Sequence, residues 1–152
     1  MKGFIMSEKY YGGASTGVRG SVIGFVSYFL EKAGIFDSVG FEGYEERGDI
    51  EAKLSLNPGG GVEKRFFDGG EMIRLPFRLT VKRRCYDAYS SLLLQDRLTL
   101  AGNVLDGLKM PIKLENARIL SIKWDSTPVR YYSGKDRTEE YSADFLLFYF
   151  SE

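Results

Sequence analysis

The chain has 152 residues, including 21 basic and 21 acidic side chains, a single cysteine and no histidine. This length suits one domain whose core needs neither disulfides nor metal. The lack of histidine excludes a Ser-His-Asp triad, a Cys-His pair and a His-ligated zinc site, whereas carboxylate or lysine chemistry stays open in principle. We expect a protein without enzymatic activity, and we assign no catalytic residue, cofactor or metal site. Zero net charge also disfavours a protein whose main task is to grip nucleic acid.

The segment at residues 1–17 has no periodic pattern and ends in glycine and serine, so we interpret it as a mobile N-terminal arm. Residues 18–152 are expected to form the single domain. Within residues 12–21 two glycines have the separation of a P-loop, but the Lys-Ser/Thr pair that would hold phosphate and magnesium is missing. Nucleotide binding is therefore not expected there.

Helical spacing of apolar residues predicts a first helix over 18–34, which Gly34 would end. The apolar window at 22–30 is far shorter than a membrane span. Glu8 and Lys9 precede any long apolar run, which is not typical of a signal peptide. We expect a soluble intracellular protein without a membrane partner.

Alternating apolar residues predict a strand over 49–57, and the following PGGG (58–61) predicts a loop. A short return strand over 62–67 and a glycine turn at 68–70 would complete a long, protruding hairpin. The next strand, 71–84, carries apolar residues on one face, namely Ile73, Leu75, Phe77, Leu79 and Val81. Its other residues are largely polar or basic.

This strand contains the basic cluster best suited to a functional role. Its cations are Arg74, Arg78, Lys82 and Arg83. They are explained either as a solvated outer face or as an interface with acidic or backbone groups of another chain. Direct nucleic-acid recognition is the third reading, since no aromatic stacking platform alternates with these cations.

A second helix is predicted between Asp87 or Ser90, either of which can cap its start, and Gly107. Its core stripe comprises Leu94, Leu98, Ala101, Leu105 and Leu108. Further apolar residues are expected to widen that stripe: Leu93, Leu100 and Val104.

A strand over 117–125 should point Leu120, Ile122 and Trp124 inward. The final strand, 139–150, has one core face, formed by Tyr141, Ala143, Phe145, Leu147 and Tyr149. A second apolar set, Leu146, Phe148 and Phe150, would face solvent unless the N-terminal arm or another subunit covers it. We favour another subunit.

The order of elements predicts an α+β fold, with an antiparallel sheet of about four to five strands and two main helices packed on one face.

The run FDGGEMIRLPFRLTVKRR, the helix ending LDGLKMP and the closing segment ARILSIKWDSTPVRYYSGKDRTEEYSADFLLFYF resemble the minor capsid and tail-terminator (tail completion) proteins of long-tailed bacteriophages and prophages. The resemblance covers roughly residues 18–150 and is one of spacing. It implies a virion protein, made in the bacterial host cytoplasm, that forms a ring, commonly a hexamer. Such a ring caps the tail tube and joins it to the head connector.

The resemblance implies that the cations of 71–84 and the apolar residues of the last strand are interface residues that meet neighbouring subunits, the tail tube protein or the connector protein. Two alternatives stay open. One is another connector or baseplate component, and the other is a small-molecule-binding domain whose pocket is lined by the tyrosines and phenylalanines of 131–150.

Overall fold

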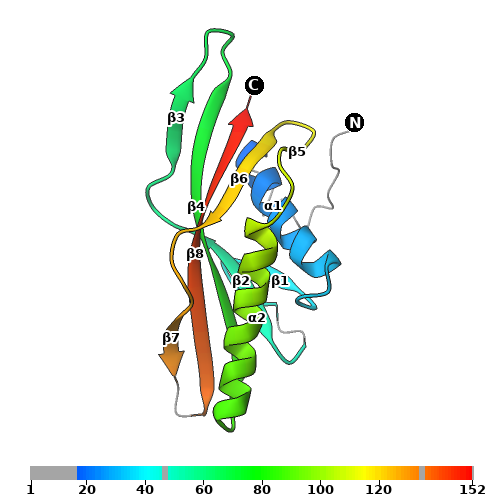
Figure 1. Ribbon diagram of the computed structural model, residues 1–152, viewed down its shortest axis with the longest axis vertical. Coiled ribbons are helices and arrows are strands. Elements are labelled where there is room, and N and C mark those ends of the chain that lie inside the picture. Colours follow the sequence, from blue (N-terminus) through cyan, green and yellow to red (C-terminus); the bar gives the residue numbers. More distant parts are fainter. Residues whose placement is uncertain (1–16, 46–47, 134–135, 152) are drawn as a thin grey trace.

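The computed structural model describes residues 17–45, 48–133 and 136–151. These described residues form two helices and eight strands (Figure 1). The helices are α1 (Gly17–Lys32) and α2 (Ala88–Asp106). The strands are β1 (Val39–Phe41), β2 (Glu51–Leu56), β3 (Gly61–Arg65), β4 (Glu71–Arg84), β5 (Ile112–Lys113), β6 (Arg118–Trp124), β7 (Val129–Ser133) and β8 (Thr138–Ser151). The arm expected at 1–17 lies outside the described residues apart from Gly17, which begins α1.

The strands form one mixed sheet in the order β1-β2-β4-β8-β6-β5, with β3 added beside β4 and β7 beside β8. β1 pairs with β2 in parallel, whereas the other pairs are antiparallel. The prediction of an antiparallel sheet of about four to five strands is therefore wrong. β1 has only three residues and β5 only two, too few for alternation to reveal them.

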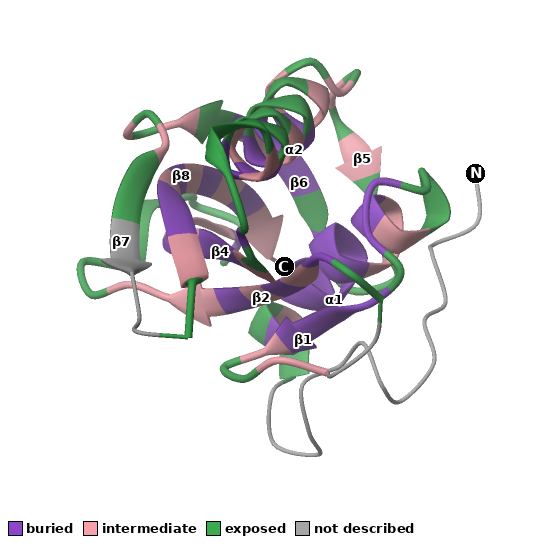
Figure 2. Ribbon diagram, turned by 90° about the horizontal axis from the view of Figure 1, so that it is seen from below, coloured by how far each residue is buried: buried purple, intermediate pink, exposed green. Residues whose placement is uncertain are grey.

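The sheet curls into a half-barrel, seen along its long axis in Figure 2, and its buried residues gather on the side that faces the helices. α2 contacts β4, β6 and β8, and α1 contacts β1. Residues of both helices join one hydrophobic core. The short strands β1 and β5 lie at the two edges of this curled sheet. The molecule therefore contains more strands than its sequence pattern indicates.

The two longest strands, β4 and β8, pair over their full 14 residues. Phe77 and Phe145 lie directly opposite one another, are fully buried and stack with ring centroids 5.2 Å apart. The predicted core face of β8 is confirmed, and so is that of β4 except at Ile73, which is half-buried. This pair forms the centre of the sheet.

The sequence signals for the end of α1 and for the start of α2 are both confirmed. Gly34 has a φ of 76°, and the Ile35 N–H donates to Leu30 O, which forms a Schellman-type end after α1. Asp87 caps α2 by accepting a hydrogen bond from the Ser90 N–H, 2.8 Å away. Of the two predicted capping residues, the structure selects Asp87.

The core stripe of α2 is confirmed at Leu94, Leu98, Ala101 and Leu105, while Leu108 is half-buried. The prediction that Leu93 and Leu100 widen this stripe is wrong, because both are exposed. A helix turns about 100° per residue, so Leu100 lies roughly 200° around the axis from Leu98. α2 is therefore apolar on two opposite sides.

β6 departs from regular alternation at a bulge. Ile119 pairs with Tyr149 and Ser121 with Phe148, which leaves Leu120 as the extra residue. Ile119 and Ile122 are buried, whereas Leu120 is only half-buried, so the prediction that Leu120 points inward is wrong. One inserted residue is enough to shift the inward face, and alternation alone does not locate it.

The predicted hairpin is confirmed. β3 pairs with the start of β4, and the turn between them projects beyond the rest of the sheet (Figure 1). Neither helix in the described part of the chain is long and apolar enough to cross a membrane.

Candidate interface on the outer face of the sheet

The convex outer face of the β4–β8 pair carries most of the residues that the sequence singles out. The register sets Arg74 opposite Phe148, Arg78 opposite Asp144 and Lys82 opposite Glu140. Leu146 lies opposite Pro76 between these pairs. The outer face is thus apolar toward the hairpin end and charged toward the other end.

Arg78 and Asp144 form the centre of this face. Arg78 Nε donates to Asp144 Oδ1 at 2.8 Å, and a second nitrogen lies 3.3 Å from Oδ2. Asn57 Nδ2 donates to the same Oδ1 at 2.9 Å. The Arg78 hydrogen bond, assisted by that of Asn57, lowers the pKa of Asp144 below its ordinary value. The carboxylate therefore neutralises a predicted interface cation within the chain.

Arg74 holds the glycine-rich β2–β3 connection against the outer face. Its Nε donates to Gly59 O at 2.9 Å, and its guanidinium lies 3.6 Å from Glu63. A Cβ atom at Gly60 would lie 3.0 Å from Arg74 O and 3.3 Å from Pro76, so glycine lets the connection lie close to the strand without displacing it. The predicted PGGG loop covers part of the face.

Lys82 and Arg83 also have partners in the same chain. Lys82 Nζ is 4.0 Å from Glu51 and lies over the Tyr44 ring, 4.1 Å from its centroid. Arg83 points to the opposite side of β4, is mostly buried and contacts Asp49 at 2.6 Å. The four predicted cations therefore do not form one continuous surface, and each has an acidic neighbour.

The apolar residues Leu146, Phe148 and Phe150 are half-buried. Phe66 at the end of the hairpin lies against Phe150, with ring centroids 5.7 Å apart, and the Arg118 guanidinium lies 5.4 Å from the same ring. Part of the cover that we expected from the N-terminal arm or another subunit thus comes from the hairpin and β6.

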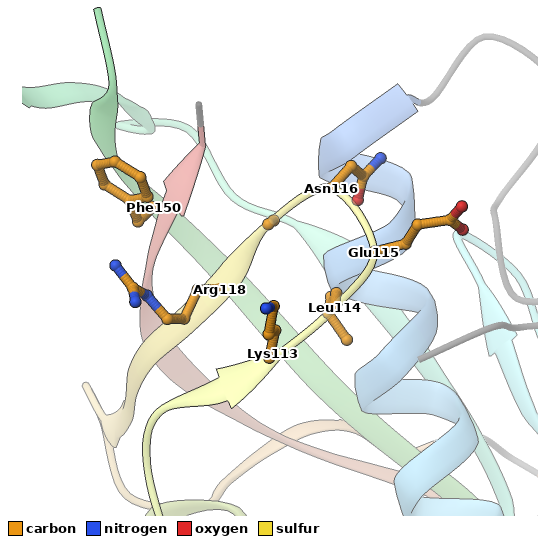
Figure 3. A pocket seen from close by; sticks show the side chains of 7 residues that line it. Lys113, Leu114, Glu115, Asn116, Arg118 and Phe150 are labelled. Carbon is orange, nitrogen blue, oxygen red and sulfur yellow. The ribbon is translucent and has the colours of Figure 1, made fainter. Parts of the chain in front are cut away.

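A hollow of about 500 Å³ opens beside Phe150, between β8 and the β5–β6 turn (Figure 3). Lys113 and Arg118 lie on its β5 and β6 sides, whereas the Glu115 carboxylate points away toward α1. Neither cation pairs with a carboxylate among the described residues. The hairpin end of the molecule therefore carries cations that are not neutralised.

A second surface was missed by the sequence prediction. The outward side of α2 exposes four large apolar side chains, Tyr89, Leu92, Leu93 and Leu100. Tyr89, Leu93 and Leu100 lie within about 40° of one another around the helix axis. A helical projection of the sequence would have separated them from the core stripe. An exposed apolar grouping of this kind is a candidate site of protein contact.

Other polar groups near α2 serve the fold. Ser91 Oγ donates to Glu139 at 2.8 Å, and the Ser91 and Tyr141 hydroxyls are 2.8 Å apart in the interior. Burial raises the pKa of the Cys85 thiol, which favours its protonated form. Within 17–45, 48–133 and 136–151 no three metal-ligating side chains cluster.

The comparisons with known proteins yield a fold relationship. No family model matches the chain, and no curated protein matches it. Among solved structures, it is similar to a chain of the virion of a native gene transfer agent particle, with a TM-score of 0.50 and 11% sequence identity. The match covers 92% of this chain and 90% of that one. The chain therefore shares its overall fold with a protein found in a virion particle.

Proposed function

We propose that this protein is a structural component of a phage-like virion. The observation that carries the proposal is the fold shared along nearly the whole length of both chains with a protein of a gene transfer agent particle. The residue patterns that resemble those of phage tail proteins support the same proposal independently of the fold.

More specifically, we propose a tail terminator that assembles as a ring, with six subunits as the expected number. Its partners would be the tail tube protein and the head–tail connector protein, and it would be made in the bacterial host cytoplasm before incorporation. The protein would act by assembly and not by catalysis. The exposed α2 side chains and the projecting hairpin support this, since both are available for protein contacts.

The small-molecule alternative is less well supported. Its proposed lining residues include the aromatic side chains of β8, yet Phe145 is fully buried between Phe77 and Trp124, with ring centroids 5.2 and 4.8 Å away. Tyr149 is almost completely buried, and burial raises the pKa of its hydroxyl. These rings fill the core, where a ligand would have to displace them.

The proposal is tested by deleting the gene in a strain that produces the particle and examining the products by electron microscopy. We expect filled heads that lack tails together with free tails of irregular length, and restoration of complete particles when the gene is supplied in trans. Normal particles in the deletion strain would refute a structural role. Complete tails that lack only a baseplate would support a virion role but refute the tail-terminator assignment.

A further inference from the structure

Two exposed apolar surfaces lie in separate parts of the molecule. The hairpin patch consists of Phe66, Phe67, Lys64 and Arg118, gathered at the hairpin end beside Phe150. Phe67 is fully exposed at the turn, and Phe66 is 39% exposed. Large aromatic side chains at this level of exposure are costly in water and are typical of binding anchors.

The helix patch consists of Tyr89, Leu92, Leu93 and Leu100, together with Asp96 on the same side of α2. The exposed fractions are 69% for Tyr89, 55% for Leu92, 38% for Leu93 and 49% for Leu100. The core stripe lies on the opposite side of α2, so these residues contribute little to folding. As a group on one side of the helix, they form a candidate contact surface for another molecule.

The charges of the two patches are opposite. Lys64 lies 5.3 Å from the Phe66 ring centroid and Arg118 lies beside Phe150, and neither pairs with a carboxylate within the described ranges. Asp96, in the middle of α2, pairs with no cation of those ranges, and the capping carboxylate of Asp87 adds negative charge at the start of the helix. The exposed Asp68 carboxylate, next to Phe67 in the same turn, accepts a hydrogen bond from the Gly70 N–H and offsets one of the two cations. The hairpin patch is thus cationic in balance and the helix patch is acidic, so the two are complementary although the chain as a whole has no net charge.

The two patches also differ in shape and position. The hairpin patch projects at one end of the long axis, and α2 begins at the other end (Figure 1). One molecule therefore presents a protruding element and a helical surface that cannot meet each other in the same chain. A contact between two different patches of identical subunits is heterologous, and it produces a closed ring when the rotation between subunits closes.

We propose that the hairpin patch of one copy docks on the helix patch of the next copy. Phe67 contacts the Leu92–Leu93 side of α2, and Lys64 and Arg118 lie near Asp96. The interface rests on the proposed function only for its closure into a ring, because the pairing of the patches is argued from this chain alone.

Two variants with opposite defects test this proposal. Phe67→Asp damages the hairpin patch and keeps the helix patch, whereas Leu93→Arg does the reverse. Both positions are exposed, so circular dichroism and melting should stay like those of the wild type. Val129→Asp, which alters an exposed apolar residue outside both patches, is the matched control. Native mass spectrometry of the full chain reads the subunit number in each case.

We expect the wild type and the control to form the same oligomer and each patch variant to be monomeric. A mixture of the two variants, one of them labelled with ¹⁵N, should form a one-to-one dimer and nothing larger, because only one intact pair of patches remains. Wild type that is monomeric at every soluble concentration, patch variants that assemble normally, or a mixture that stays monomeric would each overturn the proposal. If each variant formed its own dimer, the contact would be isologous, and the proposal would also be wrong.

Charge reversal provides a second readout. Asp96→Lys should raise the dissociation constant of the contact roughly tenfold or more, and adding Lys64→Glu to the same chain should recover part of that loss. Equal affinity in all three proteins would remove the electrostatic part of the proposal. If these solution tests fail but the deletion strain produces tailless heads, the proposed interface is refuted and the structural role is kept. If the solution tests succeed but the deletion strain produces normal particles, the interface is kept and the structural role is refuted.

Discussion

Arg78 and Asp144 face each other across the β4–β8 pair, with Arg78 Nε 2.8 Å from Asp144 Oδ1. Both side chains are only partly exposed, and Asn57 adds a hydrogen bond to the same carboxylate. The pair therefore ties the two longest strands to the β2–β3 connection. A cation that looked available for a partner has a structural role in the monomer.

The Arg78 pair predicts a difference between two arginines on the same strand. Arg78→Glu would place two carboxylates side by side, and we expect it to lower the free energy of unfolding by about 2–4 kcal/mol. Arg74→Glu should change it by less than about 1 kcal/mol, since Arg74 and Glu63 are both more exposed than the Arg78–Asp144 pair and solvent screens their charges. Urea unfolding of both variants measures the difference, and equal effects would contradict the structural role of Arg78.

The lowered pKa of Asp144 predicts a dependence of stability on pH. An unfolded aspartate has a pKa of about 3.9, so the folded state binds fewer protons at this residue. Its contribution to stability is present above that value and is lost as the pH falls through the lower folded pKa. The stability difference between wild type and Asp144→Asn should therefore be largest near neutral pH and shrink in acid. Unfolding free energies measured over this pH range test it, and a constant difference would contradict it.

α2 predicts opposite outcomes for two leucines five residues apart. Leu98 is fully buried, so Leu98→Asp places a charge in the core and should unfold the domain. Leu93 is exposed, and Leu93→Asp should change the free energy of unfolding by less than about 1 kcal/mol. Circular dichroism during thermal melting distinguishes them. Unfolding by both substitutions would show that the outward side of α2 is part of the core.

The close contact between α2 and β6 predicts that Gly102→Ala lowers the stability of the protein, although alanine favours helix formation. A methyl group at Gly102 would overlap the Trp124 ring, which also packs against Phe145. Alanine favours the helix by about 1 kcal/mol, but overpacking costs typically 1–3 kcal/mol, so we expect a net loss for Gly102→Ala. Thr99→Ala on the exposed side of α2 is the control and should be neutral or slightly stabilising. A rise in melting temperature for Gly102→Ala would contradict the packing.

The elements that could be predicted from sequence are those with enough residues to show a period. The stripe from Leu94 to Leu105 and the alternation from Leu75 to Val81 each extend over several repeats, and both are confirmed. β1 has only three residues and pairs in parallel, so no local sequence pattern predicts it. The bulge at Leu120 is likewise set by pairing with β8.

The candidate interface was harder to predict, since it depends on contacts between segments far apart in the chain. Arg78 and Asp144 are joined by strand register, and the loop at Gly59 is held by Arg74. Sequence shows the charges but not these partners. The outward position of Leu100 was available from helical geometry, although counting apolar residues placed it with the core.

The measurement that tests the central claim most directly is native mass spectrometry of the full chain over a wide concentration range, with retained ligands read in the same spectra. Assembly as a structural ring predicts one closed oligomer, with six subunits expected, that carries no stoichiometric small molecule. A monomer at every concentration, or a monomer or dimer that retains a stoichiometric small molecule, would contradict it.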